Sequence, residues 1–209
     1  MKLSILIRKL ALEKNDYISS ETLKEYCKDI KTSYLTTVKY LLRHNYIVRI
    51  LKGIFYVKSL EERKFKKINI NYLDAVKKAL EIKKIENWYF GLETALKLNK
   101  VTHEYFTLDY VFTDSLFRPK PVTIMNHKIK FIKVNARLFR FGIIKNSLNY
   151  SNIEKTILDF IYIGKYNSLS DNEIKNNIVD LLKLSSKRKL KIYLKYYPKT
   201  VTKLLKGII

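Results

Sequence analysis

The sequence predicts an α+β fold, because helical and strand-like segments follow one another in separate blocks. Apolar residues recur at helical spacing in the first part of the chain, and two β-rich runs follow them around Lys52-Gly53. Further strand-like runs lie between residues 110 and 144, and helical spacing returns from residue 151 onward. We therefore expect helices with a hairpin at the N-terminus, followed by a mixed α/β domain with a small antiparallel sheet and a helical C-terminus.

The first two helices are predicted from the spacing of their apolar side chains. Over residues 3–14 these side chains are Leu3, Leu6, Ile7 and Leu10. A second, short helix begins near Ser20, with Ser19 or Ser20 as its N-cap. Its apolar side carries Leu23, Cys27 and Ile30. We interpret Cys27, the single cysteine, as a small buried apolar residue.

A third helix is predicted over residues 32–44, and its two sides differ in chemistry. At roughly 100° per residue, one side is apolar and carries Leu35, Val38, Leu41 and Leu42. The opposite stripe carries Ser33, Thr36, Thr37, Tyr40 and His44, with Lys39 and Arg43 on its flank. In a DNA major groove, hydroxyl groups of this kind contact base edges and basic side chains contact phosphates. An ordinary solvated helix surface is the alternative explanation.

The segment "YIVRILKGIFYV" predicts a hairpin in which Gly53 supplies a positive φ. Three helices followed by a two-stranded wing predict a winged helix-turn-helix over residues 1–60. In that arrangement Arg49, Lys52 and Lys58 contact the DNA backbone beside the groove. The complete set of predicted DNA-binding residues is Ser33, Thr36, Thr37, Lys39, Tyr40, Arg43, Arg49 and Lys52.

The net charge is strongly positive, with 42 Lys and Arg residues against 19 Asp and Glu residues, or +23. Such an excess favours polyanionic partners such as DNA or RNA. A coding sequence rich in A and T is the alternative explanation, because Lys outnumbers Arg and Gln is absent. The sequence lacks an apolar run of membrane-spanning length and the apolar core of a signal peptide. We expect a cytoplasmic protein without a disulfide.

A charged linker is predicted at residues 61–70, followed by a second domain at 71–209. This domain begins with a helix near 71–83, and "NWYFGLETALKLNKV" predicts another helix with Trp88 and Phe90 in the core. The predicted strands are 110–113, 122–125, 128–134 and 141–144. A turn at Asn126-His127 joins the second and third strands into a hairpin.

The last part of the chain is predicted to be helical and basic. Ser151 with Glu154, and Ser170 with Glu173, have the spacing of capping boxes. In "EKTILD", residues 154–159, Lys155 and Asp159 have the i,i+4 spacing of an ion pair on a helix surface.

Two short helices broken at Pro198 are predicted in the basic stretch 187–206. The residues expected to pack inward are Ile192, Leu194, Val201, Leu204 and Leu205. The basic side chains of this stretch form either a solvated face or a surface for an anionic partner, which could be DNA or an acidic protein.

No catalytic, cofactor-binding or metal-binding residues are predicted, and we expect the protein not to be an enzyme. The five glycines are too widely separated for a phosphate-binding loop, and three distant histidines with one cysteine do not form a zinc site. A metal-dependent nuclease is the enzymatic alternative, built from Glu93, Asp109 or Asp114, and Lys130. The strand around Lys130 lacks the neighbouring carboxylate that such a nuclease requires.

The chain resembles the AbiEi-type antitoxins, the transcriptional regulators of type IV abortive-infection toxin–antitoxin systems of the phage-defence type. The resemblance covers most of residues 1–165 through "LKGIFYV", "NWYFGLETALKLNKVTHE", "VFTD…IKFIKV…FG" and "EKTILD", taken in this order. It implies a DNA-binding repressor that recognises repeats in its own promoter. It also implies a domain that counteracts a cognate nucleotidyltransferase toxin without requiring a stable complex. A solitary winged-helix regulator and, more remotely, an interaction scaffold remain the alternatives.

Overall fold

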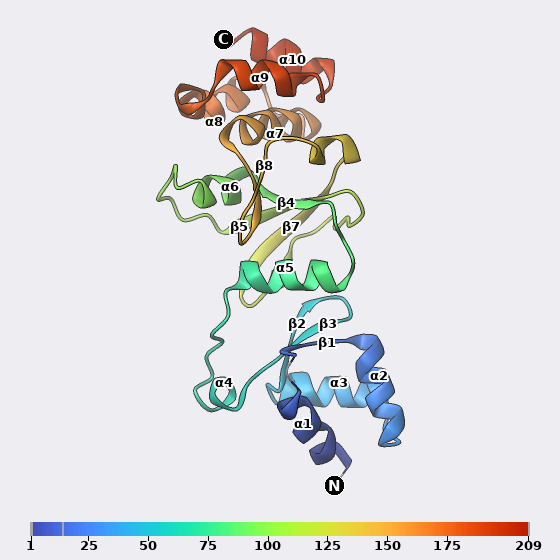
Figure 1. Ribbon diagram of the computed structural model, residues 1–209. Coiled ribbons are helices and arrows are strands. Elements are labelled where there is room, and N and C mark those ends of the chain that lie inside the picture. Colours follow the sequence, from blue (N-terminus) through green and yellow to red (C-terminus); the bar gives the residue numbers. More distant parts are fainter. Residues whose placement is uncertain (1, 14, 209) are drawn as a thin grey trace. The chain divides into compact units, whose positions relative to one another are not determined.

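The computed structural model describes residues 2–13 and 15–208 and has an α+β fold. The chain divides into two compact units (Figure 1). The first comprises residues 1–86 with 124–126, and the second comprises 87–123 with 127–209. This division differs from the predicted boundaries, which were 1–60, 61–70 and 71–209.

The first unit begins with helices around a small antiparallel sheet. Its elements up to residue 57 are α1 (Lys2–Leu12), β1 (Tyr17–Ser19), α2 (Ser20–Asp29), α3 (Tyr34–Arg43), β2 (Ile47–Leu51) and β3 (Ile54–Val57). The strands pair in the order β1-β3-β2. The sequence analysis missed β1, because a strand of three residues carries too short a pattern and depends on its pairing with β3.

The core of these elements contains the apolar residues that the helical spacing indicated. Its buried members are Leu6, Leu10, Ile18, Leu23, Val38, Leu41, Ile47, Phe55 and Val57. Ser19 is the N-cap of α2, and its Oγ accepts a hydrogen bond from the Thr22 N–H at 3.1 Å. Cys27 is buried, as the sequence predicted.

The predicted linker contains helix α4 (Leu60–Lys64), and the next helix, α5 (Tyr72–Ile82), belongs to the first unit. Glu62 is buried, and hydrogen bonds from the Tyr56 hydroxyl and from the Asn69 N–H at 2.7 Å to its carboxylate offset the cost of that burial. Helix α5 packs on β2 and β3, so that the hairpin is covered on the side away from α1–α3 as well. The assignment of residues 61–70 to a linker and of 71–83 to the second domain was therefore wrong.

The second unit contains a mixed sheet, which corrects the prediction of a small antiparallel one. Its strands are β4 (Trp88–Gly91), β5 (Leu108–Thr113), β6 (Val122–Ile124), β7 (His127–Lys133), β8 (Ile143–Lys145) and β9 (Asn149–Ser151). The strand order is β6-β7-β5-β4-β9-β8. Strands β5 and β7 are parallel, as are β4 and β9, whereas β4 and β9 each pair antiparallel with their other neighbour.

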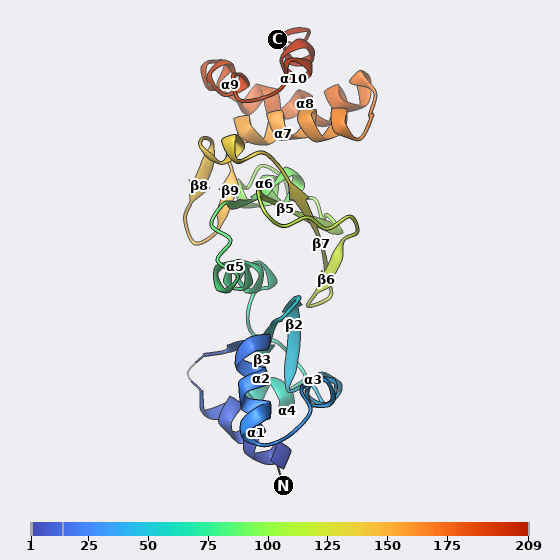
Figure 2. The same ribbon diagram turned by 90° about the vertical axis from the view of Figure 1, so that its right-hand side faces the viewer.

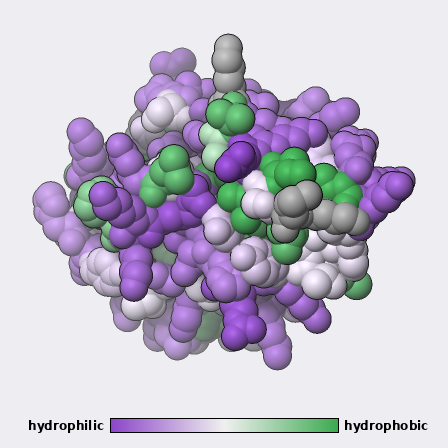
Figure 3. Space-filling model, turned by 90° about the horizontal axis from the view of Figure 1, so that it is seen from below, coloured by the Kyte–Doolittle hydropathy of each residue, from purple (hydrophilic) through white to green (hydrophobic). Residues whose placement is uncertain are grey.

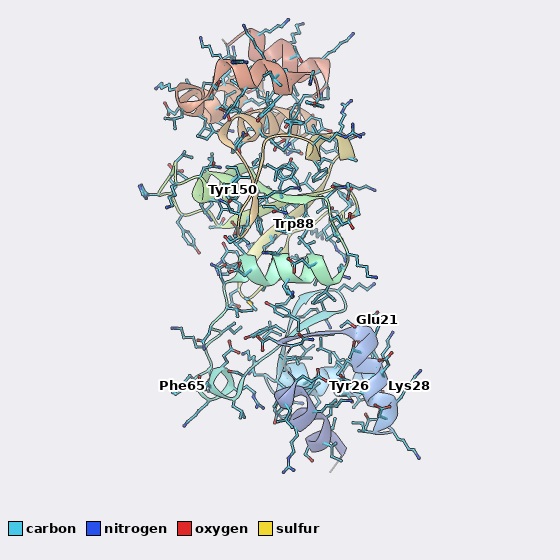
Figure 4. All side chains as sticks on the ribbon, viewed as in Figure 1. Glu21, Tyr26, Lys28, Phe65, Trp88 and Tyr150 are labelled. Atoms are coloured by element: carbon cyan, nitrogen blue, oxygen red, sulfur yellow. The ribbon has the colours of Figure 1, made fainter. Side chains whose placement is uncertain are left out.

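One predicted helix in the second unit begins as a strand. Residues Trp88–Gly91 form β4, and α6 (Leu92–Leu98) starts only after them. Consecutive aromatic side chains favour strand geometry, and here both faces of the strand are buried. Figure 4 shows Trp88 on β4 and Tyr150 on β9, which pairs with β4 through Phe90.

Four helices complete the second unit: α7 (Ile153–Tyr166), α8 (Asp171–Leu184), α9 (Lys187–Leu194) and α10 (Lys199–Lys206). A short 3-10 helix, η1 (Ala136–Phe139), precedes β8. Helix α7 contacts α6 and β9 as well as α8, α9 and α10, and Figure 2 shows these four helices together. Within residues 2–13 and 15–208, every helix is too short or too polar to cross a lipid bilayer.

The predicted helix caps and buried residues of this region are confirmed only in part. Ser170 and Glu173 form the predicted capping box. The N-cap of α7 is Asn152, not Ser151, and Glu154 instead accepts a hydrogen bond from the Ser186 N–H at 3.1 Å. Ile192 is exposed, contrary to prediction, whereas the other four residues expected to pack inward are buried.

Candidate nucleic-acid interface

Helix α3 presents a face rotated from the predicted one. Thr37 is only 2% exposed and its hydroxyl hydrogen-bonds the Thr32 hydroxyl at 3.4 Å, so the assignment of Thr37 to DNA contact was wrong. Leu35, predicted to be buried, is 69% exposed. The buried residues of the helix are Thr37, Val38 and Leu41. Because these three form the side that packs on the core, Leu35 points toward solvent.

The open face of α3 retains most of the predicted contact residues. Ser33 is the N-cap but makes no capping hydrogen bond, and Thr36, Lys39 and Arg43 are exposed. Tyr40 is half-buried, with its ring centroid 4.3 Å from that of His44 and 6.3 Å from that of Tyr46. The face therefore offers hydroxyl groups and two cations beside an aromatic group that is held in place.

The turn between β2 and β3 is fixed by Gly53. Its φ of +81° lies in the left-handed region, and its carbonyl accepts a hydrogen bond from the Ser20 N–H at 2.7 Å. A Cβ at this position would lie 2.8 Å from the Ser20 Oγ, so a side chain would strain both the backbone and the contact. The turn leaves Lys52 exposed at its tip.

Arg49 lies on the edge strand β2, opposite Phe55 of β3. Its guanidinium carbon is 5.7 Å from the Phe55 ring centroid. Residues opposite each other in an antiparallel pair share a face of the sheet, so Arg49 lies on the side where Phe55 joins the helical core. Lys58 is buried, which corrects its assignment to the DNA backbone.

The segment that carries this face contains basic residues and no acidic ones. The sequence from residue 30 to 60 contains no Asp or Glu. Within the described part of the chain, Lys39, Arg43, Arg49 and Lys52 form no ion pair. Figure 3 views the first unit from the α1 side and shows mainly hydrophilic side chains with limited hydrophobic patches. We call Ser33, Thr36, Lys39, Tyr40, Arg43, Arg49 and Lys52 the α3 surface.

Among the carboxylates of the nuclease alternative, Asp109 lies near enough to Glu93 for its charge to raise the pKa of Glu93, whereas Asp114 has a separate partner. Asp109 is buried and accepts hydrogen bonds from the Thr94 hydroxyl at 3.0 Å and from the Lys97 ammonium at 3.4 Å. Asp114 instead accepts a hydrogen bond from the Asn87 side chain at 2.6 Å. Over the described ranges, no group of three or more His, Cys, Asp or Glu side chains is placed to hold a metal ion.

The "EKTILD" segment forms a buried polar cluster in the second unit, which corrects its assignment to a helix surface. Lys155 and Asp159 of α7 are both fully buried, with 3.7 Å between Nζ and the nearer carboxylate oxygen. The Tyr89 hydroxyl donates to Asp159 at 3.0 Å, and the Tyr197 hydroxyl donates at 2.6 Å. Lys155 also lies 4.6 Å from the Phe141 ring centroid. We call Tyr89, Phe141, Lys155, Asp159 and Tyr197 the buried polar cluster.

Burial and charge act in opposition within this cluster. Burial lowers the pKa of Lys155 and raises that of Asp159, whereas the attraction between the two opposes both shifts. Burial and the nearby Asp159 charge raise the pKa values of Tyr89 and Tyr197. The charged pair and both tyrosines are buried, and their hydrogen bonds link α7 to β4 and to the segment that follows α9.

Sequence reasoning missed this cluster and the exposure of Leu35. A signal for the first was available, because Ile153, Ile157, Leu158, Ile161 and Ile163 surround the pair on almost every side of the helix. A signal for the second is the spacing of Tyr34, Val38 and Leu41, which places Leu35 outside the buried stripe.

The comparisons with known proteins establish likeness of fold alone. No family model matches the chain, and no curated protein matches it. Among solved structures, the crystal structure of the RV2827C protein from Mycobacterium tuberculosis is similar, with a TM-score of 0.56 and 13% sequence identity. The match covers 96% of this chain and 73% of the other. At that identity, the likeness carries no statement about activity.

Proposed function

We propose that the first unit is a winged helix-turn-helix domain that binds double-stranded DNA. The observation that carries the proposal is the α3 surface, an acid-free, exposed set of hydroxyl groups and cations beside the β2–β3 hairpin. The element order α1-β1-α2-α3-β2-β3 supports it, because a winged helix needs its third helix free and its hairpin adjacent.

In this arrangement α3 enters the major groove. Ser33 and Thr36 contact base edges, and the exposed Leu35 contacts a thymine methyl group. Lys39 and Arg43 on the same helix, with Arg49 and Lys52 on the hairpin, contact phosphates on either side. The ring of Tyr40 is held by its aromatic neighbours and contacts the groove from the edge of the face.

The same proposal assigns the chain to the AbiEi-type antitoxins. The first unit represses the chain's own promoter by binding repeats there, and the second unit counteracts a cognate nucleotidyltransferase toxin. A stable complex between the two proteins is not required. The support is the ordered set of sequence motifs, together with the division of the chain into two compact units.

DNA binding is tested by fluorescence anisotropy with duplex DNA from upstream of the gene, at several salt concentrations. Each phosphate contact contributes a slope of about −0.9 in log K against log salt. The double substitution Lys39→Ala, Arg43→Ala removes two contacts, so we expect the slope to become shallower by about 1.8. We also expect weaker binding to promoter and random duplexes alike, because these residues contact phosphates and not bases.

A charge-matched control is Lys64→Ala, Lys67→Ala, which removes two exposed cations from the first unit outside the α3 surface. It should bind like the original protein. Equal loss in both double variants would mean that net charge, and not the α3 surface, determines binding.

The antitoxin role is tested by inducing the adjacent nucleotidyltransferase gene in cells with and without this protein. We expect growth arrest that the full-length protein prevents. The Lys39→Ala, Arg43→Ala variant should lose promoter repression but still protect, because the proposal places protection in the second unit. Absence of protection by the original protein would refute the antitoxin role and leave a solitary regulator.

A further inference from the structure

Helices α9 and α10 each carry a row of basic side chains on the side that points away from the core. The opposite sides of both helices join the core of the second unit through Leu190, Leu194, Val201, Leu204 and Leu205. Figures 1 and 2 show both helices at the end of this unit that carries the C-terminus, next to α7, which they contact. We call the six exposed cations of these rows the basic C-terminal surface: Arg188, Lys191, Lys195, Lys199, Lys203 and Lys206.

The charge of this segment differs from that of the rest of the second unit. Residues 187–206 contain eight basic residues and no acidic one, whereas residues 87–186 contain 14 basic and nine acidic ones. A coding sequence rich in A and T would raise lysine along the whole chain and would not confine the excess to one segment. Elsewhere in the unit, Lys97 and Lys165 have acidic partners. Within the described residues, no ion pair includes a member of the basic C-terminal surface.

The cations of α9 and α10 lie where they weaken their own helices. Helix α9 begins with three basic residues at 187–189 and has no acidic residue in its first turn, although the N-terminus of a helix favours negative charge. Lys191 and Lys195 on α9, and Lys199 and Lys203 on α10, are like charges at i,i+4, a spacing at which they repel. A bound anion offsets both effects. Because local choices that oppose stability are expected at functional sites, the charge points to an anionic partner.

The composition of the surface favours a phosphate backbone over an acidic protein or a membrane. All of its cations except Arg188 are lysines, and lysine is depleted in protein–protein interfaces, where arginine and aromatic residues are enriched. The lysine ammonium is a compact charge that binds phosphates without a fixed geometry. Amphipathic helices bind membranes by burying their apolar sides in the lipid, but the apolar sides of α9 and α10 are packed inside the protein.

An apolar and an aromatic side chain accompany these cations on α9 and just after it. Ile192 is 47% exposed. The half-buried ring of Tyr196 stacks on Phe141 with 4.4 Å between the ring centroids, and the Lys195 ammonium lies 5.0 Å from the Tyr196 centroid. The bases of a duplex are stacked on one another, so only unpaired bases are free to pack on protein side chains. RNA commonly leaves bases unpaired in loops and at ends.

We propose that the basic C-terminal surface binds unpaired segments of RNA. Its cations contact phosphates, while Ile192 and the ring of Tyr196 pack against bases. Because none of these contacts is a hydrogen bond to a base edge, binding does not depend on base sequence. This inference goes beyond the proposed function and does not require DNA binding by the α3 surface.

The test is fluorescence anisotropy of the full-length protein with a short labelled single-stranded RNA of mixed sequence, at several salt concentrations. Every protein in the test also carries Lys39→Ala and Arg43→Ala, so that the α3 surface contributes little. The further substitutions Lys191→Ala and Lys195→Ala remove two phosphate contacts from a single strand. We therefore expect weaker RNA binding and a slope of log K against log salt that is shallower by about 1.4.

Two comparisons separate the surface from general charge and from duplex binding. The charge-matched control Lys128→Ala, Lys145→Ala removes two exposed cations from strands of the same unit and should bind RNA with an unchanged slope. Ile192→Ser should weaken RNA binding about threefold, because an apolar contact is lost, while it leaves the salt slope unchanged. The same substitution should have no effect on the binding of duplex DNA, which offers no unpaired base.

Equal losses of RNA binding in Lys191→Ala, Lys195→Ala and in the control pair would overturn the proposal, because net charge alone would explain the binding. Equal effects of Ile192→Ser on RNA and on duplex DNA would also overturn it, as would displacement of the RNA by polyglutamate or by anionic vesicles at the same charge concentration. If Lys191→Ala, Lys195→Ala lowers the melting temperature, Lys199→Ala, Lys203→Ala on α10 gives the same measurement with the same expected slope.

Discussion

Helices α3 and α7 each carry a pair of charged side chains at i,i+4 spacing, yet the two pairs have opposite environments. Lys39 and Arg43 on α3 are exposed and lack an acidic partner in the described structure. Lys155 and Asp159 on α7 are fully buried and bound by two tyrosines. The difference arises because α3 packs on one side only, whereas α7 is covered by β9 of the sheet and by four other helices, α6, α8, α9 and α10. Spacing therefore identifies a pair, and packing determines what the pair does.

The largest effect that would test this comparison is expected from Asp159→Ala. It leaves Lys155 buried without its counter-ion, so we expect the free energy of unfolding to fall by about 3–5 kcal/mol. Urea denaturation followed by circular dichroism measures the change. The matched control is Asp180→Ala, which breaks an exposed pair with Lys183 and should cost no more than about 0.5 kcal/mol. Similar losses in the two variants would contradict the contrast between buried and exposed pairs.

A smaller loss is expected from Tyr197→Phe, which keeps the ring but removes the hydroxyl that donates to Asp159 and accepts from the Lys155 ammonium at 3.3 Å. Hydrogen bonds to charged groups contribute about 1.5–3 kcal/mol, and we expect a loss in that range. The control Tyr166→Phe alters an exposed ring on α7 and should leave stability unchanged. Thermal or chemical denaturation of the two variants side by side gives the difference. No loss in Tyr197→Phe would show that the hydroxyl does not stabilise the buried charge.

Two adjacent threonines on α3, one buried and one exposed, test which side of the helix contacts DNA. Thr37→Val removes a buried hydroxyl whose partner is Thr32, so we expect a loss of about 1 kcal/mol in stability and no change in DNA binding. Thr36→Val should show the reverse, with normal stability and weaker binding to promoter DNA. Denaturation and anisotropy on both variants test this assignment. Weaker DNA binding in Thr37→Val alone would restore the face originally predicted from the sequence.

The smallest change in stability is expected from Lys39→Ala, Arg43→Ala. Two like charges at i,i+4 repel slightly and alanine favours the helix, so the free energy of unfolding should stay within about 0.5 kcal/mol of the original value. DNA binding should nevertheless become weaker, as proposed above. Measuring stability and binding on the same preparation separates the two effects. A large loss of stability would mean that α3 depends on these cations for packing.

Much of the first unit was predictable, because its signals are local. Ser19 caps α2 through a hydrogen bond three residues away, and Gly53 permits a turn that few other residues adopt. The apolar residues of α1 and α2 also fell where their periodicity placed them. The exceptions were Thr37 and Leu35, where two overlapping stripes of similar hydrophobicity fit the same helix. Periodicity alone does not show which of the two stripes is buried, because that depends on the elements that pack against the helix.

The second unit was less predictable, because its arrangement depends on pairing between distant segments. Strand β4 pairs with β5 and β9, so its aromatic residues extend where their local pattern suggested a helix. Glu93 and Lys130 line one cleft although 37 positions separate them in the chain, and Asp109 and Asp114 bind other partners.

The amino-acid sequence alone determined the α+β class, the strong positive charge, most helix positions and the short-range caps and turns. These features depend on side-chain chemistry within a few residues, which the sequence displays directly. The tertiary structure decided the mixed sheet, the placement of α5 in the first unit, the open side of α3 and the burial of Lys155 with Asp159. Each of these depends on which surfaces meet after folding, and a local pattern carries no information on whether a second layer will cover it.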